Sequence, residues 1–357
     1  MYQMNDQQLI KVFYHTSTLR GLAYWRCLWP AYQMALRKEI MYSSIKNYFI
    51  DALPYTTSDV VVIQRSAGDI SLKYVEKLSE LSKVSNFKLI YDVDDVLFLD
   101  DVPDFHYCKS EGKGDPKESI MEIMDLCDEI TVSTQYLKDY YHKATGIEEI
   151  TVLPNRIPFF WAGNFYSVEG LRRNYRKHKA KPRIIYAGST SHIDCAMINN
   201  DKDDFTDVLK VMEATRNEFT WVFIACCPRL LLKYVESKEM EYYKAVPLGL
   251  LPKVIHSLEP NMMIAPLADN PYNHGKSNIK FLESAAQGLP IVCQDITPYK
   301  ETPLRFKRGD ELIEKIRCTM KDEESYMEES RKAKEIVDQQ WLEIDGNISQ
   351  FKKVYSN

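Results

Sequence analysis

Several common sequence signatures are missing from this chain of 357 residues. Its eight cysteines include no CxxC pair, so we expect neither zinc nor a disulfide, but small buried thiols in a reducing compartment. No stretch approaches the ~20 apolar residues of a membrane span, and the first residues lack the basic start and apolar run of a signal peptide. We therefore expect a cytoplasmic protein without integral membrane contact.

Two further absences narrow the function. No G-x-G-x-x-G follows any predicted strand, which argues against a dinucleotide oxidoreductase. The formal net charge of −5 gives no general attraction to nucleic acid or to an anionic membrane, so such a partner requires a local basic patch. What is present is the composition of a folded protein, with 45% hydrophobic and 27% charged residues. A single core rarely grows beyond about 250 to 300 residues, so the length indicates two domains.

Short β-branched runs alternate with longer amphipathic stretches, which is typical of parallel sheets covered by helices. Nearly all of these runs are apolar on both faces, as strands between two helix layers must be. The predicted strands lie at 10–15, 60–64, 88–93, 129–133, 150–155, 183–188, 220–225, 262–267 and 290–294. The segment 158–182 breaks this rhythm and becomes strongly basic, so we interpret it as a linker between a domain at 1–157 and another at 183–335.

The turn after the predicted strand 183–188 is small and rich in hydroxyl groups. In open α/β sheets, ligands bind beyond the carboxyl ends of the strands. Backbone N–H groups and hydroxyls in such a turn can approach a phosphate. We therefore select Gly188, Ser189, Thr190, Ser191 and His192 as candidate ligands of a phosphate. The alternative is an ordinary turn between a strand and a loop.

The run 273–290, which follows the predicted strand 262–267, holds a second candidate segment. Ser277 is predicted to cap a helix, which places Lys276 at the positive end of that helix. A cation is disfavoured there unless an anionic ligand docks at the same place, so the pattern points to a diphosphate. Asn278 and Glu283 follow on the same helix. The alternative is a capped amphipathic helix with a solvated lysine.

Two segments in the first half complete the set of candidates. Asp92, Asp94 and Asp95 lie at the end of the strand 88–93. They favour orientation of an acceptor, with metal binding, a general base or no role as alternatives. Tyr24, Trp25 and Arg26, after the first strand, offer two aromatic faces and a cation to a sugar or base, although such residues often belong to the core.

The predicted linker carries a basic run, with seven full cations and no acid between residues 171 and 183. Arg172, Arg173 and Arg176 belong to this run, which could hold a polyanion by releasing its counterions. A solvated, flexible linker is the alternative.

Together these segments resemble the GT-B glycosyltransferases, in particular their retaining family 4. The turn from Gly188 to His192 matches the family's glycine-rich turn, and the run from Lys276 through Glu283 to Pro290 matches its late motif. Further matches are Gln64-Arg65, Asp92-Val93-Asp94-Asp95, Val132-Ser133-Thr134 and Leu153-Pro154-Asn155. The resemblance implies an α/β fold of two Rossmann-like domains whose parallel sheets face across a cleft. It also implies a C-terminal helix, 336–357, that returns to the first domain.

The resemblance also implies roles for these residues. Glu283 should bind the ribose of a nucleoside-diphosphate sugar, expected to be a UDP-sugar, and Lys276, Ser277, Asn278 and the turn should hold its diphosphate. Lys276 and His192, with Asp94 and Asp95, are the candidate catalytic residues. Retention, with the leaving diphosphate helping to take the acceptor proton, requires no metal, no cofactor and no enzymic nucleophile.

One departure from the family pattern concerns the donor sugar. The usual motif has two glutamates eight positions apart, and Gly275 stands at the earlier position. The arginine and lysine pair that usually follows the glycine turn is absent, and an insertion at 193–204 follows His192. These differences leave the sugar, like the oligomeric state, undetermined.

The chain also resembles glycosyltransferases of bacteriophages, some of which modify viral DNA. The favoured acceptor is a hydroxymethylated base in double-stranded DNA. This base would be flipped out of the duplex and bound between Tyr24 and Trp25. For a viral protein, the expected location is the host cytoplasm. The residues expected to bind this acceptor are Arg20, Tyr24, Trp25, Arg26, Arg65, Arg172, Arg173 and Arg176. The alternatives are a surface polysaccharide or glycolipid as acceptor, and an inactive module that binds nucleotide or DNA.

Overall fold

The protein is described by a computed structural model that covers residues 9–16, 18, 21–46, 52–106, 109, 115–164, 166–194 and 203–356. The chain forms two compact units. The first unit consists of Met1–Phe98, Asp115–Arg156 and Leu342–Asn357, and the second of Leu99–Gly114 and Ile157–Trp341. Both units are therefore discontinuous in sequence.

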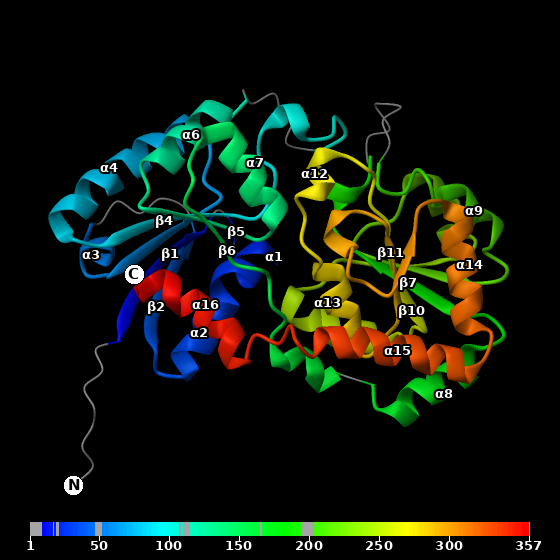
Figure 1. Ribbon diagram of the computed structural model, residues 1–357. Coiled ribbons are helices and arrows are strands. Elements are labelled where there is room, and N and C mark those ends of the chain that lie inside the picture. Colours follow the sequence, from blue (N-terminus) through cyan, green and yellow to red (C-terminus); the bar gives the residue numbers. More distant parts are fainter. Residues whose placement is uncertain are drawn as a thin grey trace, which may run out of the picture. The chain divides into compact units, whose positions relative to one another are not determined.

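The first unit is built on a six-stranded parallel sheet of order β2-β1-β3-β4-β5-β6. Its strands are β1 (Ile10–Thr16), β2 (Ile40–Lys46), β3 (Val60–Gln64), β4 (Lys88–Val93), β5 (Glu129–Val132) and β6 (Ile150–Val152). Its helices are α1 (Gly21–Ala23), the π-helical turn η1 (Tyr24–Leu28), α2 (Trp29–Leu36), α3 (Leu53–Thr56), α4 (Asp69–Ser85), α6 (Lys117–Asp125), α7 (Gln135–Thr145) and α16 (Asp345–Ser356). Helices α4, α6 and α7 cover one face of this sheet, and α2 and α16 cover the other (Figure 1).

Local sequence explains why these elements begin and end where they do. All five residues of β3 are buried, as a strand between two helix layers requires. Helix α7 begins at Thr134, whose side chain accepts a hydrogen bond from the Leu137 amide. The same helix ends at Gly146, whose φ of 77° is a left-handed conformation that glycine adopts without strain.

The second unit has its own six-stranded parallel sheet, of order β12-β11-β10-β7-β8-β9. Its strands are β7 (Arg183–Ala187), β8 (Thr220–Ile224), β9 (Glu241–Tyr243), β10 (Met262–Ala265), β11 (Ile291–Gln294) and β12 (Leu304–Phe306). Its longer helices are α8 (Val168–His178), α9 (Leu209–Ala214), α10 (Leu232–Glu236), α11 (Leu251–Ser257), α12 (Pro271–His274), α13 (Ile279–Ala285), α14 (Gly309–Met320) and α15 (Glu323–Val337). Short 3-10 turns are η2 (Leu99–Asp101), η3 (Phe159–Asn164), η4 (Thr190–His192), η5 (Arg229–Leu231), η6 (Leu248–Leu250) and η7 (Thr297–Tyr299).

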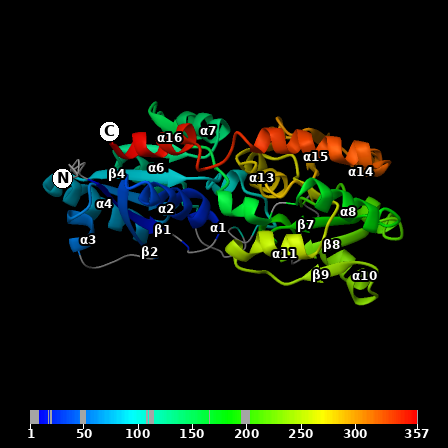
Figure 2. The same ribbon diagram turned by 90° about the horizontal axis from the view of Figure 1, so that it is seen from below.

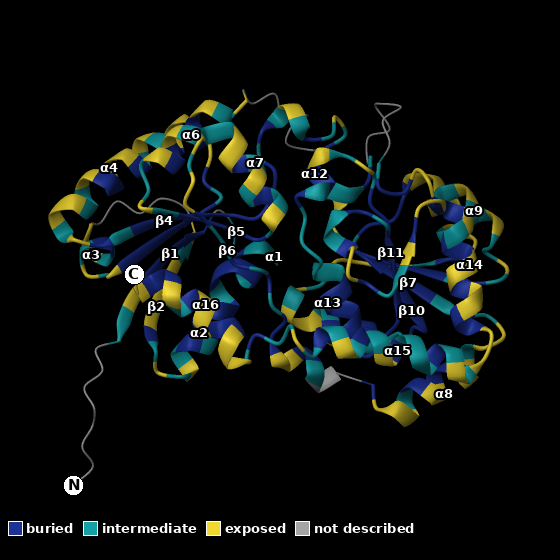
Figure 3. Cartoon of the chain, in the orientation of Figure 1, coloured by how far each residue is buried: buried dark blue, intermediate teal, exposed yellow. Residues whose placement is uncertain are grey.

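Helices cover both faces of this second sheet as well. Figure 2 shows α13, α14 and α15 on one face and α10 and α11 on the other. The predicted class, α/β with two Rossmann-like domains, is confirmed by the two parallel sheets. In both units the strands form the buried core and the exposed residues lie mainly on the outer helices and loops (Figure 3). Within the described parts of the chain, no helix is both long and apolar enough to cross a membrane.

The basic segment 158–182 differs from its interpretation as a linker, because it carries helix α8 and belongs to the second unit. Ser167 caps α8 by accepting a hydrogen bond from the Gly170 amide. Leu171 and Tyr175 are buried on one face, and the Tyr175 ring lies 5.4 Å from that of Tyr326 on α15. An amphipathic face hidden among the cations therefore turns this segment into a packed helix.

Candidate functional site

The turn after β7 and the segment after β10 leave the second sheet at the same edge, because β7 and β10 are parallel neighbours. This edge is where the sequence predicts the phosphate ligands. At Gly188, an added Cβ would overlap the Tyr186 hydroxyl, so a larger residue here would require the buried Tyr186 ring to shift. Ser189 and Ser191 follow in the turn, with their hydroxyl oxygens 2.6 Å apart, and both are at least partly exposed.

An imidazole and a carboxylate join these two segments. His192 Nδ1 lies 2.7 Å from Asp204 Oδ2. The other oxygen of Asp204 accepts hydrogen bonds from Asn273 Nδ2 at 2.6 Å and from the Ala268 amide at 2.8 Å. Asp204 is only 4% exposed, so it ties the turn after β7 firmly to the loop after β10. It closes the insertion at 193–204, whose residues 195–202 lie outside the described part of the chain.

The pKa of His192 responds to burial, to two lysine charges and to Asp204. Burial lowers the pKa of the His192 imidazole, and the positive charges of Lys276 and Lys280 lower it further. The hydrogen bond to Asp204 acts in the opposite direction on this pKa. A neutral imidazole that donates Nδ1–H to Asp204 presents Nε2 as the ring atom for a ligand.

Lys276 reaches this site from a turn and not from a helix. Helix α12 ends at His274, and α13 begins at Ile279 with Asn278 as its N-cap residue. The prediction that Ser277 caps the helix is therefore wrong, and the argument from the helix dipole does not apply to Lys276. The Lys276 ammonium instead lies 4.2 Å from the centroid of the Tyr272 ring, in a cation–π contact.

Lys280 and Glu283 lie one turn apart on α13. The Lys280 ammonium donates to the carbonyl of Ala187, the last residue of β7, and lies 4.9 Å from the centroid of the Tyr186 ring. Burial lowers the pKa of Lys280, against the attraction of Glu283. Burial also raises the pKa of Glu283 to about 7, against the attraction of Lys280. Lys280 was not among the predicted site residues, although its i,i+3 spacing from Glu283 was a signal for a shared helix face.

These groups suit a particular kind of ligand. Two lysine ammonium groups and a turn with exposed hydroxyls can bind an anion such as a phosphate. The buried Glu283 carboxyl can accept hydrogen bonds from hydroxyl groups. A cavity of about 400 Å³ adjoins Asp204 and Ala268, and it is lined in part by Asp100–Asp104.

In the first unit, Arg26 forms a buried ion pair at the carboxyl end of β4. Its guanidinium lies 2.7 Å from Asp92 and also donates to the Leu153 carbonyl and to Asn155 Oδ1. Thr131 donates to the same carboxylate at 2.8 Å. Arg26 is 2% exposed, so the structure gives it an internal structural role and not a surface for an acceptor.

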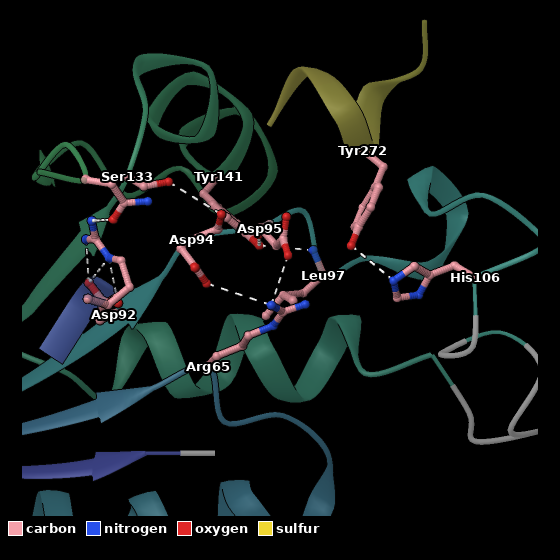
Figure 4. A network of polar contacts seen from close by, with 11 residues as sticks. Arg65, Asp92, Asp94, Asp95, Leu97, His106, Ser133, Tyr141 and Tyr272 are labelled. Carbon is pink, nitrogen blue, oxygen red and sulfur yellow. Dashed lines mark hydrogen bonds and ion pairs between the residues drawn. The ribbon is translucent and has the colours of Figure 1, made fainter. Parts of the chain in front are cut away.

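Asp94 and Asp95 gather around a second arginine at this edge (Figure 4). Arg65 Nη1 lies 2.9 Å from Asp95 and 3.9 Å from Asp94. Asp94 Oδ1 is buried without a hydrogen-bond partner, and burial raises the pKa of this carboxyl to about 6, against the charge of Arg65. Tyr141 donates to the Asp95 carbonyl at 2.7 Å and fixes the backbone here. Among the described residues, no group of three or more His, Cys, Asp or Glu side chains is arranged to hold a metal ion.

Comparison with known proteins identifies the fold. No protein-family model and no curated protein matches this chain. Among solved structures, it is similar to an alpha-glucosyltransferase in complex with UDP and a 13-mer DNA containing a HMU base, with a TM-score of 0.62 and 10% identity over 98% of this chain and 100% of that one. It is also similar to TarM, with a TM-score of 0.55 and 11% identity over 84% of this chain and 55% of that one. The fold is of the GT-B type.

Besides Arg26 and Arg65, the residues predicted to bind the acceptor fall into three groups. Arg20 lies outside the described residues. Trp25 is buried in an edge-to-face contact with Trp29 at 4.8 Å, whereas Tyr24 is half-buried. Arg172 and Arg176 on α8 pair with Glu323 at 3.3 and 2.9 Å, and Arg173 is exposed. The charge of α8 is thus partly neutralised by the protein itself.

Proposed function

We propose that this protein is a glycosyltransferase that moves a sugar from a nucleoside-diphosphate sugar to a hydroxyl acceptor. One observation carries the proposal: Lys280 donates to the end of β7, Lys276 lies on the segment after β10, and the His192–Asp204 pair joins these two segments at the carboxyl edge of the sheet. A GT-B fold shared with an alpha-glucosyltransferase that holds UDP supports the same conclusion.

The groups at this edge have complementary roles in the proposal. Lys276 and the turn from Gly188 to Ser191 bind the diphosphate, and Lys280 adds positive charge from the side of β7. Glu283 accepts hydrogen bonds from the ribose. His192 faces the bound donor through Nε2, and the cavity beside Asp204 leaves room for the sugar.

The proposed reaction depends on the stability of the leaving group. The bond between the anomeric carbon and the diphosphate oxygen breaks, and the acceptor hydroxyl oxygen forms the new bond to that carbon. With retention, the acceptor proton passes to the departing diphosphate. Fixed cations lower the barrier because negative charge accumulates on this diphosphate in the transition state.

For the acceptor, we propose a hydroxymethylated base in double-stranded DNA. Support comes from the similar alpha-glucosyltransferase, which was solved with DNA containing a HMU base. Asp94 is the candidate group for orienting the acceptor hydroxyl, because its Oδ1 has no hydrogen-bond partner in this structure. Arg65, which lies beside this carboxylate, is the candidate for a contact with the DNA backbone.

The proposal is tested in two stages. Thermal shift with UDP and other nucleoside diphosphates should identify the nucleotide, and mass spectrometry should then detect sugar transfer to hydroxymethylated but not to unmodified duplex. Lys276→Ala should lower turnover by about two to three orders of magnitude, as loss of one key electrostatic contact does. Lys315→Ala, an exposed lysine on α14, is the matched control. If no nucleoside diphosphate stabilises the protein, the proposal is wrong.

A further inference from the structure

A segment from the middle of the first unit's sequence packs into the second unit next to the proposed diphosphate site. Leu99–Gly114 follows β4 and precedes α6, yet it belongs to the second unit. His106 in this segment is only 2% exposed. Its Nε2 lies 3.1 Å from the Tyr272 hydroxyl, and the two rings are 5.1 Å apart (Figure 4). Tyr272 is therefore hydrogen-bonded to a residue far away in sequence.

Hydrogen bonds of neighbouring residues also fix the helix that carries Tyr272. Tyr272 lies in α12, which begins at Asn270, whose side chain accepts from the Asn273 amide at 2.8 Å. Asn273 in turn donates to Asp204, the partner of His192. Tyr272 is 3% exposed, so its ring has little freedom to move.

The face of this ring carries the Lys276 ammonium, 4.2 Å from the ring centroid. A lysine side chain is long and flexible. When a ligand immobilises it, the side chain loses conformational entropy, and this loss weakens binding. A ring that already holds the ammonium reduces this loss. The ring itself keeps its orientation through the hydroxyl that meets His106.

We infer that Tyr272 and His106 are positioning residues for Lys276 in the binding of the donor diphosphate. The inference rests on the proposed function. It adds two residues to the donor site that have no phosphate contact of their own, one of them from the segment between β4 and α6.

The test compares UDP with uridine, which lacks the phosphates, by titration calorimetry on the full chain. Tyr272→Leu should weaken UDP binding roughly tenfold, as loss of a cation–π contact does, and leave uridine binding unchanged. Tyr272→Phe and His106→Asn should each weaken UDP binding by a smaller factor, about two- to threefold, because the ring stays but its hydrogen bond changes. Tyr326→Phe removes another buried hydroxyl and is the control, with no change expected.

A second comparison separates positioning from general stability. In a Lys276→Met background, Tyr272→Leu should cause no further loss of UDP affinity, because the group that it positions is gone. An equal loss of UDP and uridine binding, or a loss that persists in this background, would overturn the inference. If Tyr272→Leu does not fold, Tyr272→Phe and His106→Asn decide the question in the same way.

The outcomes also distinguish this inference from the proposed function. If the native protein binds UDP or another nucleoside diphosphate and these variants bind it equally well, only the positioning roles are wrong. If the native protein binds no nucleoside diphosphate, both proposals fail.

Discussion

Glu283, the proposed ribose ligand, opposes the stability of the fold when it is ionised. Burial raises the pKa of this carboxyl to about 7, so the folded protein resists its ionisation. Its contribution to stability is therefore present at low pH and is lost as the pH rises through about 7. A group kept at this cost in a buried site is consistent with a role in ligand binding.

Glu283→Gln should therefore stabilise the protein while weakening the donor complex. We expect the free energy of unfolding to rise at pH 8 by up to about 3 kcal/mol, with little change at pH 5. UDP affinity should fall in the same variant. Urea unfolding at the two pH values measures the first effect, with the exposed Glu314→Gln as the control. Equal effects of Glu283→Gln at both pH values would contradict this account of the carboxyl.

Asp94 makes a separate prediction for the acceptor. Since burial raises the pKa of Asp94 to about 6, its carboxylate form is lost as the pH falls through about 6. Sugar transfer should decline over that range, and Asp94→Asn should lower transfer by about two orders of magnitude at pH 8. UDP affinity should not change in this variant. Sugar transfer and UDP binding are measured in parallel across this pH range, for the native protein and for Asp94→Asn. If the variant transfers sugar normally, Asp94 takes no part in the reaction.

Residue chemistry explains which parts of the site could be predicted from sequence. His192, Lys276 and Glu283 follow predicted strands at positions where ligands usually bind, and in the structure Asp204 joins the His192 turn to the segment that carries Lys276. Asp204 was not predicted, because it lies 12 residues after His192 and the sequence does not show that the chain folds back to bring the two together. Arg26 was assigned to an acceptor because sequence does not show that a lone arginine is buried.

Among the secondary-structure elements, the buried strands were predicted and several edge strands were not. Strands β2, β9 and β12 lie at the edges of their sheets. Five residues of β2 and two of β9 are exposed, so these strands lack the continuous apolar run that marks a central strand. Helix α8 was missed for a related reason, since its many cations obscure a narrow apolar face.

Helix α8 also decides how its cations should behave toward DNA. Arg172 and Arg176 share Glu323, which competes with any phosphate for these guanidinium groups. If α8 contacts the duplex, Glu323→Gln should strengthen duplex binding a few-fold at low salt, and alanine at Arg172, Arg173 and Arg176 should weaken it and flatten its salt dependence. Fluorescence anisotropy over a range of salt concentrations measures both. Unchanged binding in the two variants would remove α8 from the acceptor surface.

Across the whole molecule, the fold class and the approximate extent of the strand-rich halves follow from sequence, whereas the division of the chain does not. From sequence, both domains were predicted to be continuous apart from the C-terminal helix that returns to the first domain. In the structure, the segment 99–114 belongs to the second unit although the residues before it belong to the first. The segment 342–357 belongs to the first unit although the residues before it belong to the second. Periodicity reports which residues are buried and gives no information on which sheet buries them.

The C-terminal helix α16 provides a test at this scale. It packs on β1 and α2 of the first unit, and Tyr355 meets Tyr14 at 6.1 Å between ring centroids. Phe351 on this helix is 1% exposed, so Phe351→Ala should lower the free energy of unfolding by about 3 to 5 kcal/mol. Because α16 belongs to the first unit, UDP binding should survive at temperatures where the variant stays folded. Calorimetric scans with and without UDP measure both effects. A variant with the same Tm as the native protein would contradict the predicted destabilisation, and a variant whose Tm does not respond to UDP would contradict the retained binding.

The excursion of the chain through 99–114 affects how this protein can be dissected and recombined. A fragment that starts at residue 157 would omit His106 and leave the Tyr272 hydroxyl without the histidine that it meets in the intact chain. A chimera of two related chains, made by one crossover between residues 106 and 272, takes these two positions from different parents. Tyr272 would then face whatever residue the other parent has in place of His106. On the proposed positioning roles, moving the diphosphate site into another scaffold requires two separate stretches of sequence to be moved together.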